Sequence, residues 1–362
     1  MSLSEGQLLA ISIAERTCSA VSLLSAGAAV LTFLTWKAFR TPINRLIFYA
    51  LCGNIVLNIA TLISKSGVDH GVGSPLCSFQ AFLIQWLFPA DALWALCIAW
   101  NVYLRFFYRY DSKQLRRLEW KYVLFCYVMP FIPALTLLFI RTRSRGRVYG
   151  SGLFECWIAL SWDSLRIALL YGPVWLVIAV ITIIYTRVGL YIYSHLKHLR
   201  ALGMTGDWTE DVNRIADAST TEMHEMTSTP FRAYHGHSQA DETSASRQQT
   251  SSTHSINRRA RELVRVGSDS NMAAWAYARY SFLFFIALLV TWVPSTINRL
   301  STLINPQYLS FGMNYAAAFV IPLQGFWNSV IYFTISRREF KALSGHRETS
   351  QSNSARIFHL GH

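Results

Sequence analysis

The sequence predicts an all-α membrane protein, a bundle of seven transmembrane helices with the N-terminus outside and the C-terminus in the cytoplasm. Three observations support this fold class: 52% of the 362 residues are hydrophobic and 15% are charged, long uncharged runs recur, and Lys and Arg gather in alternate connections. Ordinary soluble domains carry about 25% charged residues. The composition therefore excludes an ordinary soluble domain.

Seven uncharged or nearly uncharged runs are long enough to cross the membrane as helices, which takes about 20 apolar residues. They are Thr17–Trp36, Leu46–Ser64, Leu76–Leu104, Tyr122–Ile140, Ile167–Thr186, Tyr280–Asn298 and Tyr308–Ser336. The third run is longer than a bilayer requires and contains one formal charge, Asp91. We expect this helix to tilt and to contact most of the others.

The distribution of positive charge predicts the orientation. With the N-terminus outside, 25 of the 33 Lys and Arg residues lie in cytoplasmic segments and the other eight lie outside. The positive-inside rule favours this arrangement, and the bias persists when the long third inner loop is left out. We therefore expect a multi-pass protein of the plasma membrane, in which the net charge of +13 indicates lipid contact and not nucleic acid.

The expected organisation has five parts. Residues 1–16 form a short extracellular N-terminus without the basic start of a cleaved signal peptide. Residues 17–192 hold helices 1–5, 193–274 form the third cytoplasmic loop, 275–336 hold helices 6 and 7, and 337–362 form a cytoplasmic amphipathic helix and tail. The loop is rich in Ser, Thr, Gln and His, so we expect most of it to be disordered.

The second outer loop departs from the charge rule, because RTRSRGR (141–147) lies on the side where positive charge is scarce. Either this run is a solvated face, or it is an electrostatic collar that draws anionic ligands to the bundle. The same loop contains Cys156, and Cys77 lies at the outer end of the third span. A bond between them would hold the loop over the bundle, in the compartment where disulfides persist.

Four polar residues of the spans are candidate ligand contacts. A buried carboxylate such as Asp91 must find partners, and it serves either as a structural or switch residue or as a ligand contact. Its depth, roughly 21 Å below Cys77 by helical rise, favours the switch. Arg166 and Arg299 lie at the outer ends of the fifth and sixth spans, where they either snorkel to the interface or converge on an anion. Asn298 adds a neutral polar group.

The sixth span contains the candidate hinge, Trp292 with Pro294. Proline removes a backbone hydrogen bond and allows a helix to kink. The alternative is a kink without a functional role.

Other classes of protein fit less well. The spans contain no His, no cluster of metal-ligating residues and no nucleophile with a base, so we expect no enzyme, no metal and no cofactor. The seventh span has no Lys for a retinal Schiff base. A transporter or channel is the remaining alternative, although a single intramembrane carboxylate argues against it.

Five short sequences occur in order along the spans and the second outer loop. They are Leu93–Ala99 (LWALCIA), Cys156–Ile158 (CWI), Tyr171–Pro173 (YGP), Trp292–Val293 followed by Asn298–Arg299, and Gly325–Trp327 (GFW). Together they make the chain resemble the cyclic-AMP receptor family of G-protein-coupled receptors, known from slime moulds and with a fungal receptor-like branch. The chain departs from it in its longer third inner loop.

The resemblance implies a receptor that senses an extracellular small molecule and activates a heterotrimeric G protein through movement of helix 6. It also implies the Cys77–Cys156 bridge and outer arginines at 166 and 299. Residues Arg105, Arg109, Arg116 and Arg117 would contact the G-protein α subunit, and kinases would act on the third loop and tail (Ser344, Thr349, Ser350). We prefer an anionic ligand; a nutrient or sugar sensor of the same fold is the alternative.

Overall fold

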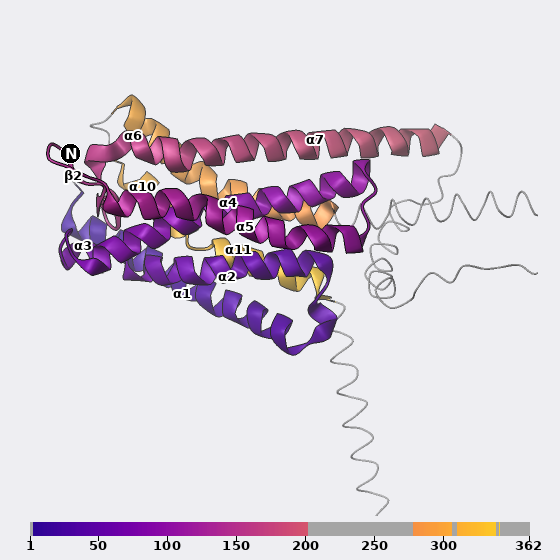
Figure 1. Ribbon diagram of the computed structural model, residues 1–362, viewed down its shortest axis with the longest axis horizontal. Helices are drawn as coiled ribbons and strands as arrows, with labels where there is room; N and C mark the ends of the chain where they lie inside the picture. Colours follow the sequence, from indigo (N-terminus) through magenta and orange to yellow (C-terminus); the bar gives the residue numbers. More distant parts are fainter. Residues whose placement is uncertain (1–2, 202–277, 306–309, 338–339, 341–362) are drawn as a thin grey trace, which may run out of the picture. The chain divides into compact units, whose positions relative to one another are not determined.

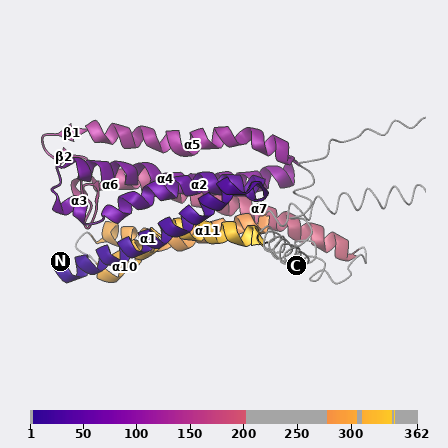
Figure 2. The same ribbon diagram turned by 90° about the horizontal axis from the view of Figure 1, so that it is seen from below.

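The structure is a computed structural model that describes residues 3–201, 278–305, 310–337 and 340. The chain divides into two units, Met1–Ile192 with Tyr280–His362, and Tyr193–Arg279. In the first unit long helices run side by side in both views (Figures 1 and 2). The long helices are α1 (Glu5–Thr35), α2 (Pro42–Ile63), α4 (Pro75–Phe107), α5 (Ser112–Phe139), α7 (Gly172–Ala201), a helix at Ala278–Ile304, α10 (Phe311–Val320) and α11 (Gln324–Ile335).

Short elements lie between the long helices. They are η1 (Lys37–Phe39), α3 (Ser66–Asp69), η2 (Leu160–Trp162), α6 (Asp163–Arg166), the π-helical turn η3 (Ile167–Tyr171), and strands β1 (Arg141–Thr142), β2 (Gly146–Arg147), β3 (Tyr149–Ser151) and β4 (Cys156–Ile158). The strands and the first residues of α1 lie at the same end of the bundle (Figure 1). We call this the outer end, following the orientation predicted from charge.

The described residues contain six helices that are long and apolar enough to cross a membrane. The pair α10 and α11, bent by 41° at a short break, makes a seventh span. The predicted seven-helix fold class is confirmed. The seventh span is not the continuous helix that the run Tyr308–Ser336 suggested, because Pro322 lies in the break and cannot donate a backbone hydrogen bond.

Two helices, α1 and α5, begin well before their apolar runs, at Glu5 and Ser112. The α1 helix begins at Glu5, where Ser4 and Gln7 form a capping box: each side chain hydrogen-bonds the other residue's backbone N–H. Asp111 and Gln114 do the same at the start of α5, at distances of 2.7 and 2.9 Å. These polar starts satisfy N–H groups that a helix leaves unpaired. Because these helix starts are polar, hydrophobicity alone does not detect them. Most of the predicted N-terminal segment 1–16 is helical, from Glu5 onward.

The α4 helix is the centre of the bundle. In its apolar stretch 83% of the residues are buried, against 28–50% in the other five spans. It contacts α2, α5 and the β3–β4 hairpin. The length of the third run and its carboxylate, Asp91, predicted this position, because an ionisable residue inside the membrane must face the interior of the bundle.

Gly325, in the first turn of α11, allows a close approach to α1 and α2. A Cβ atom at this position would lie 2.6 Å from Oγ of Ser22 and 3.2 Å from Cβ of Asn54. The backbone N–H of Phe326 donates to the same Ser22 oxygen at 3.1 Å. A side chain here would separate the seventh span from its neighbours.

We expect Gly325→Ala to lower the free energy of unfolding by about 1–3 kcal/mol, the usual cost of overpacking. Thermal unfolding of the purified protein in detergent measures the change. The matched control is Gly27→Ala in α1, where nothing lies within 4 Å of the added Cβ. Equal unfolding midpoints for the two variants would contradict the close approach.

Several predicted segments fall largely outside the described residues. Helix α7 continues to Ala201, so the predicted third loop (193–274) starts as helix, and its residues from 202 onward are not described. The predicted kinase sites in the tail also lie outside the described residues. Of the predicted amphipathic helix and tail (337–362), Arg337 and Phe340 are described. The N–H of Phe340 donates to the Ser336 carbonyl at 3.2 Å, and its ring lies 4.6 Å from that of Phe39.

Candidate ligand-binding site

The second outer loop folds into two antiparallel hairpins. Strand β1 pairs with β2, and β3 pairs with β4 with Ser151 opposite Cys156. All residues of the arginine-rich run 141–147 are exposed on the first hairpin. The second hairpin is buried against the bundle. The two alternatives predicted for this arginine-rich run, an electrostatic collar or a solvated face, therefore apply to the first hairpin alone.

The Cys77–Cys156 disulfide joins β4 to the first turn of α4, across 79 residues of sequence. This confirms the predicted bridge. Two glutamines of α4 continue the attachment: Gln80 Oε1 accepts from the backbone N–H of Cys156 at 3.1 Å, and Gln85 Oε1 accepts from Nε1 of Trp157 at 2.9 Å. The loop is therefore held over the bundle at three successive points.

Beneath this hairpin lies a cavity of about 610 Å³. Its walls come from α4, the loop and α6, η3, the helix Ala278–Ile304 and α10. Aromatic residues (Phe88, Trp157, Tyr171, Trp292) and charged residues (Glu155, Asp163, Arg166, Arg299) line it. The volume and this mixture of apolar walls with few polar groups are typical of a small-molecule site.

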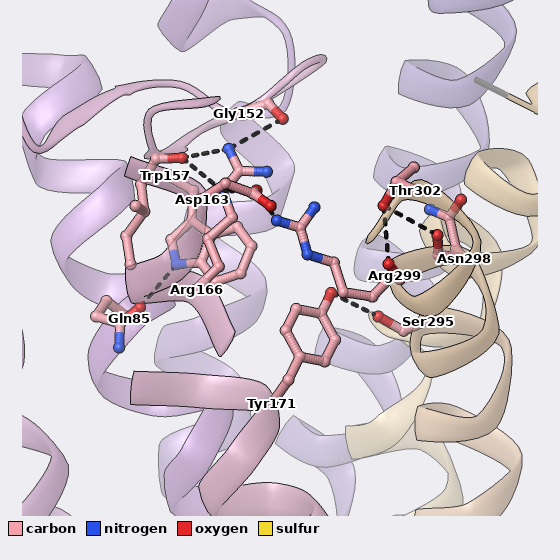
Figure 3. A network of polar contacts seen from close by, with 11 residues as sticks. Gln85, Gly152, Trp157, Asp163, Arg166, Tyr171, Ser295, Asn298, Arg299 and Thr302 are labelled. Carbon is pink, nitrogen blue, oxygen red and sulfur yellow. Dashed lines mark hydrogen bonds and ion pairs between the residues drawn. The ribbon is translucent and has the colours of Figure 1, made fainter. Parts of the chain in front are cut away.

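Arg166 holds the loop in place. Its Nε donates to the Ile158 carbonyl at 2.8 Å and Nη2 donates to the same carbonyl and to that of Gly152 at 3.3 Å. Its guanidinium lies 4.9 Å from the centre of the Trp157 ring (Figure 3). This side chain is 4% exposed, and its N–H groups donate to backbone carbonyls of the loop. Arg166 therefore helps to form the wall of the cavity.

Arg299 approaches Arg166 from the opposite side of the cavity. One Nη of Arg299 forms an ion pair with Asp163, which lies between the two arginines (Figure 3), and Asp163 is also 3.9 Å from Arg166 Nε. The Nε of Arg299 is buried without a hydrogen-bond partner among the described residues. The two predicted arginines thus converge, with a carboxylate between them.

Asn298 and Tyr171 connect helices around the cavity. Asn298 Nδ2 donates to Oδ1 of Asn314 at 2.9 Å, which joins the sixth span to α10. Tyr171 ends the π-helical turn η3, and its hydroxyl lies 3.1 Å from Oγ of Ser295. A π turn adds a residue to the helical repeat and occurs often at functional sites. Here the π turn ends at Tyr171, whose side chain contacts the sixth span.

Asp91 lies away from this cavity. It accepts hydrogen bonds from Asn54 Nδ2 of α2 at 2.8 Å, from Asn328 Nδ2 of α11 at 3.0 Å and from Gln324 Nε2. It is absent from the residues that line the ligand cavity. This position joins three helices and favours the switch interpretation over direct ligand contact.

The candidate hinge borders the cavity floor. Trp292 is buried, and its ring centre lies 6.2 Å from that of Phe88 and 6.3 Å from that of Tyr171, both edge to face. Pro294 lies within the unbroken helix Ala278–Ile304. A ligand in the cavity would touch the residues next to the proline.

The four arginines proposed for the G protein lie around the connection between α4 and α5. Arg109, Arg116 and Arg117 are exposed, whereas Arg105 is half-buried in the last turn of α4. The neighbouring ion pair Arg45–Glu119, at 2.5 Å, joins α2 to α5. Within the part of the chain that the structure describes, no three His, Cys, Asp or Glu residues are grouped to hold a metal ion.

Sequence reasoning assigned no role to Glu155, Asp163 or Tyr171. The two acidic residues lie in the loop whose arginines were noted, and an acid among outer arginines is the signal that could have found them. Which arginine each acid meets depends on the path of the loop, and the spacing along the chain does not contain that path.

The comparisons with known proteins agree with the predicted family. The family model described as slime mold cyclic AMP receptor matches residues 8–201. Cyclic AMP receptor 1 of Dictyostelium discoideum is 29% identical over 167 residues, 44% of this chain and 40% of that receptor. Cyclic AMP receptor 2 of the same organism is 26% identical over 193 residues, 51% and 49%. These alignments span less than half of each relative.

The fold comparison matches squid rhodopsin, with a TM-score of 0.59 at 12% sequence identity, covering 95% of this chain and 86% of that one. At this identity the match shows the seven-helix fold alone. The relatives are receptors and not enzymes, as the sequence predicted. Because the family model covers more than half of the sequence, this chain belongs to the slime mold cyclic AMP receptor family.

Proposed function

We propose that this protein is a plasma-membrane G-protein-coupled receptor that binds a small anionic molecule in the outer cavity. The observation that carries the proposal is Arg299, a buried guanidinium whose Nε faces no partner among the described residues in a cavity of about 610 Å³. A phosphate or carboxylate is the complement of a guanidinium. Cyclic AMP, the ligand in the names of the relatives, is the first compound to test.

Binding would exchange the partner of Arg299. In the structure one of its Nη atoms pairs with Asp163, so an incoming anion competes with that carboxylate. Asp163 is 40% exposed and can turn to water at little cost. The ligand then stabilises whichever bundle arrangement brings Arg299 closer to it, because a ligand shifts an equilibrium only by its differential affinity.

The change at Arg299 would reach the inner end through the sixth span. The Tyr171–Ser295 contact and the hydrogen bond from Trp175 Nε1 to Thr296 Oγ1, 3.2 Å long, hold the two residues that follow Pro294. Outward movement of helix 6 about Pro294, accommodated at Asp91 by the bent seventh span, would open a cleft for the G-protein α subunit. Arg105, Arg109, Arg116 and Arg117 are the proposed contacts, with inner-leaflet lipid beside them and kinases acting on the loop and tail.

The test is nucleotide exchange on a panel of G-protein α subunits, with purified receptor in lipid and cyclic AMP, inorganic phosphate and neutral sugars as candidate ligands. We expect an anion to stimulate exchange. Arg299→Gln should raise its half-maximal concentration by about 10–100-fold, since a hydrogen bond to a charged group is worth about 1.5–3 kcal/mol.

Two further variants sharpen this experiment. Arg143→Gln alters an exposed arginine of the first hairpin and should leave the half-maximal concentration almost unchanged, which separates the cavity from the collar. Asp163→Asn removes the competing charge and should lower it. Stimulation by a neutral sugar, with the same response in Arg299→Gln, would favour the nutrient-sensing alternative and contradict the anion site.

A further inference from the structure

A pair of acidic side chains lies behind the cavity, where the second outer loop meets α1. Glu15 of α1 is 3% exposed, and its carboxyl group lies beside that of Glu155. Glu15 also accepts from Oγ of Ser64, which lies 3.0 Å from Oγ of Ser12. The other oxygen of Glu155, Oε2, is buried without a hydrogen-bond partner among the described residues, and Glu155 lines the cavity.

Two neighbouring carboxyl groups that are shielded from water do not both ionise, because the second charge would face the first at short range in a medium of low dielectric constant. They share a proton instead. The charged groups that face the pair are Arg16 on the α1 side and Arg166 on the cavity side, where the neutral hydroxyl of Tyr171 also lies. Burial raises the pKa of Glu155 to about 7, although Glu15 and Arg166 act in the opposite direction.

The charge of Glu155 decides the charge balance of the cavity. When Glu155 is ionised, the lining carries two positive charges, Arg166 and Arg299, and two negative ones, Asp163 and Glu155. When Glu155 takes a proton from water, one positive charge is left without compensation. An anion is then bound by a site of opposite net charge.

We propose that Glu155, supported by Glu15, is the residue that determines the ligand charge this receptor accepts, and that the pair takes up a proton when an anion binds. The inference rests on the proposed anion site. The inference predicts the direction of the pH dependence. Affinity for an anion rises as pH falls through the titration of the pair, whereas affinity for a neutral ligand stays constant.

The experiment measures binding of cyclic AMP and of inorganic phosphate to the full chain in lipid, from about pH 8 to about pH 6, one unit on each side of that pKa. One linked proton changes an affinity by at most about tenfold per pH unit. We expect an increase of about 3–10-fold per unit on acidification. Phosphate itself titrates in this range, so cyclic AMP gives the decisive curve.

Two isosteric variants identify the groups. Glu155→Gln should bind the anion at every pH with the affinity of the wild type at pH 6. Glu15→Gln should keep the pH dependence but move it to higher pH, because Glu15 lowers the pKa of Glu155. The matched control is Glu5→Gln, which alters an 85% exposed carboxylate of the same helix, paired with Lys65, and should keep the full dependence. A flat wild-type curve, or a dependence that survives in Glu155→Gln, would overturn the inference.

Infrared difference spectra between the two pH values provide a readout without ligand. The C=O stretch of a protonated carboxyl should grow on acidification in the wild type and in Glu5→Gln, and be absent in Glu155→Gln. If no anion binds but this band behaves as expected, the proposed ligand is wrong and the proton-binding pair is supported. If the band does not change in the wild type, the inference fails whatever the receptor binds.

Discussion

Replacing both Cys77 and Cys156 by serine is expected to lower the free energy of unfolding by about 4 kcal/mol. The bridge closes a loop of 79 residues, and a cross-link of this span removes about that much entropy from the unfolded chain. The cavity should be lost with it, since β4 carries Trp157 and lies beside Glu155. Thermal unfolding in detergent and binding of cyclic AMP measure the two effects.

The control for this variant is Cys52→Ser, which changes a free, half-buried cysteine of α2. It should unfold near the wild-type midpoint. A reducing agent should reproduce the loss in the wild type and leave the double-serine variant unaffected. Unfolding midpoints that are identical with and without reductant would show that the hydrogen bonds of Gln80 and Gln85 suffice to hold the loop.

Replacing Asp91 by alanine is expected to cost about 3 kcal/mol and to change basal nucleotide exchange. The carboxylate accepts from amide groups of Asn54, Gln324 and Asn328, and its removal leaves three buried donors unsatisfied at about 1 kcal/mol or more each. Unfolding in a detergent series measures the cost, and exchange without ligand measures the switch. Asp91→Asn, which retains one acceptor oxygen, should lose less.

The matched control lies on the same helix. Asn101 is buried in α4 and accepts one hydrogen bond, from Tyr122, at 2.7 Å. Asn101→Ala should cost about 1 kcal/mol and leave basal exchange unchanged. If Asp91→Ala were no worse than Asn101→Ala, or if exchange did not respond, Asp91 would be a local contact and not a junction of α2, α4 and α11.

Sequence reasoning reached the fold because the bilayer makes each span a local problem. A span must be apolar over about 20 residues and satisfy its own backbone, so the seven helices can be predicted without knowledge of their neighbours. The disulfide was also within reach, since few cysteines lie at span ends on the outer side. Helix starts were missed where a capping box, as at Ser4, lies outside the apolar run.

The ligand-binding site could not be predicted in the same way as the helices, because its chemistry depends on which residues, distant along the chain, lie close together in the fold. The sequence by itself determined that Asp91 had to find partners, since buried charge is costly without them, and it placed Arg166 and Arg299 at the outer ends of their spans. Only the tertiary structure decided the partners: backbone carbonyls for Arg166, Asp163 for Arg299, amides from two other helices for Asp91, and Glu15 for Glu155. Electrostatic energy falls with distance through space, and the fold brings residues 15 and 155 into contact although they are far apart along the chain.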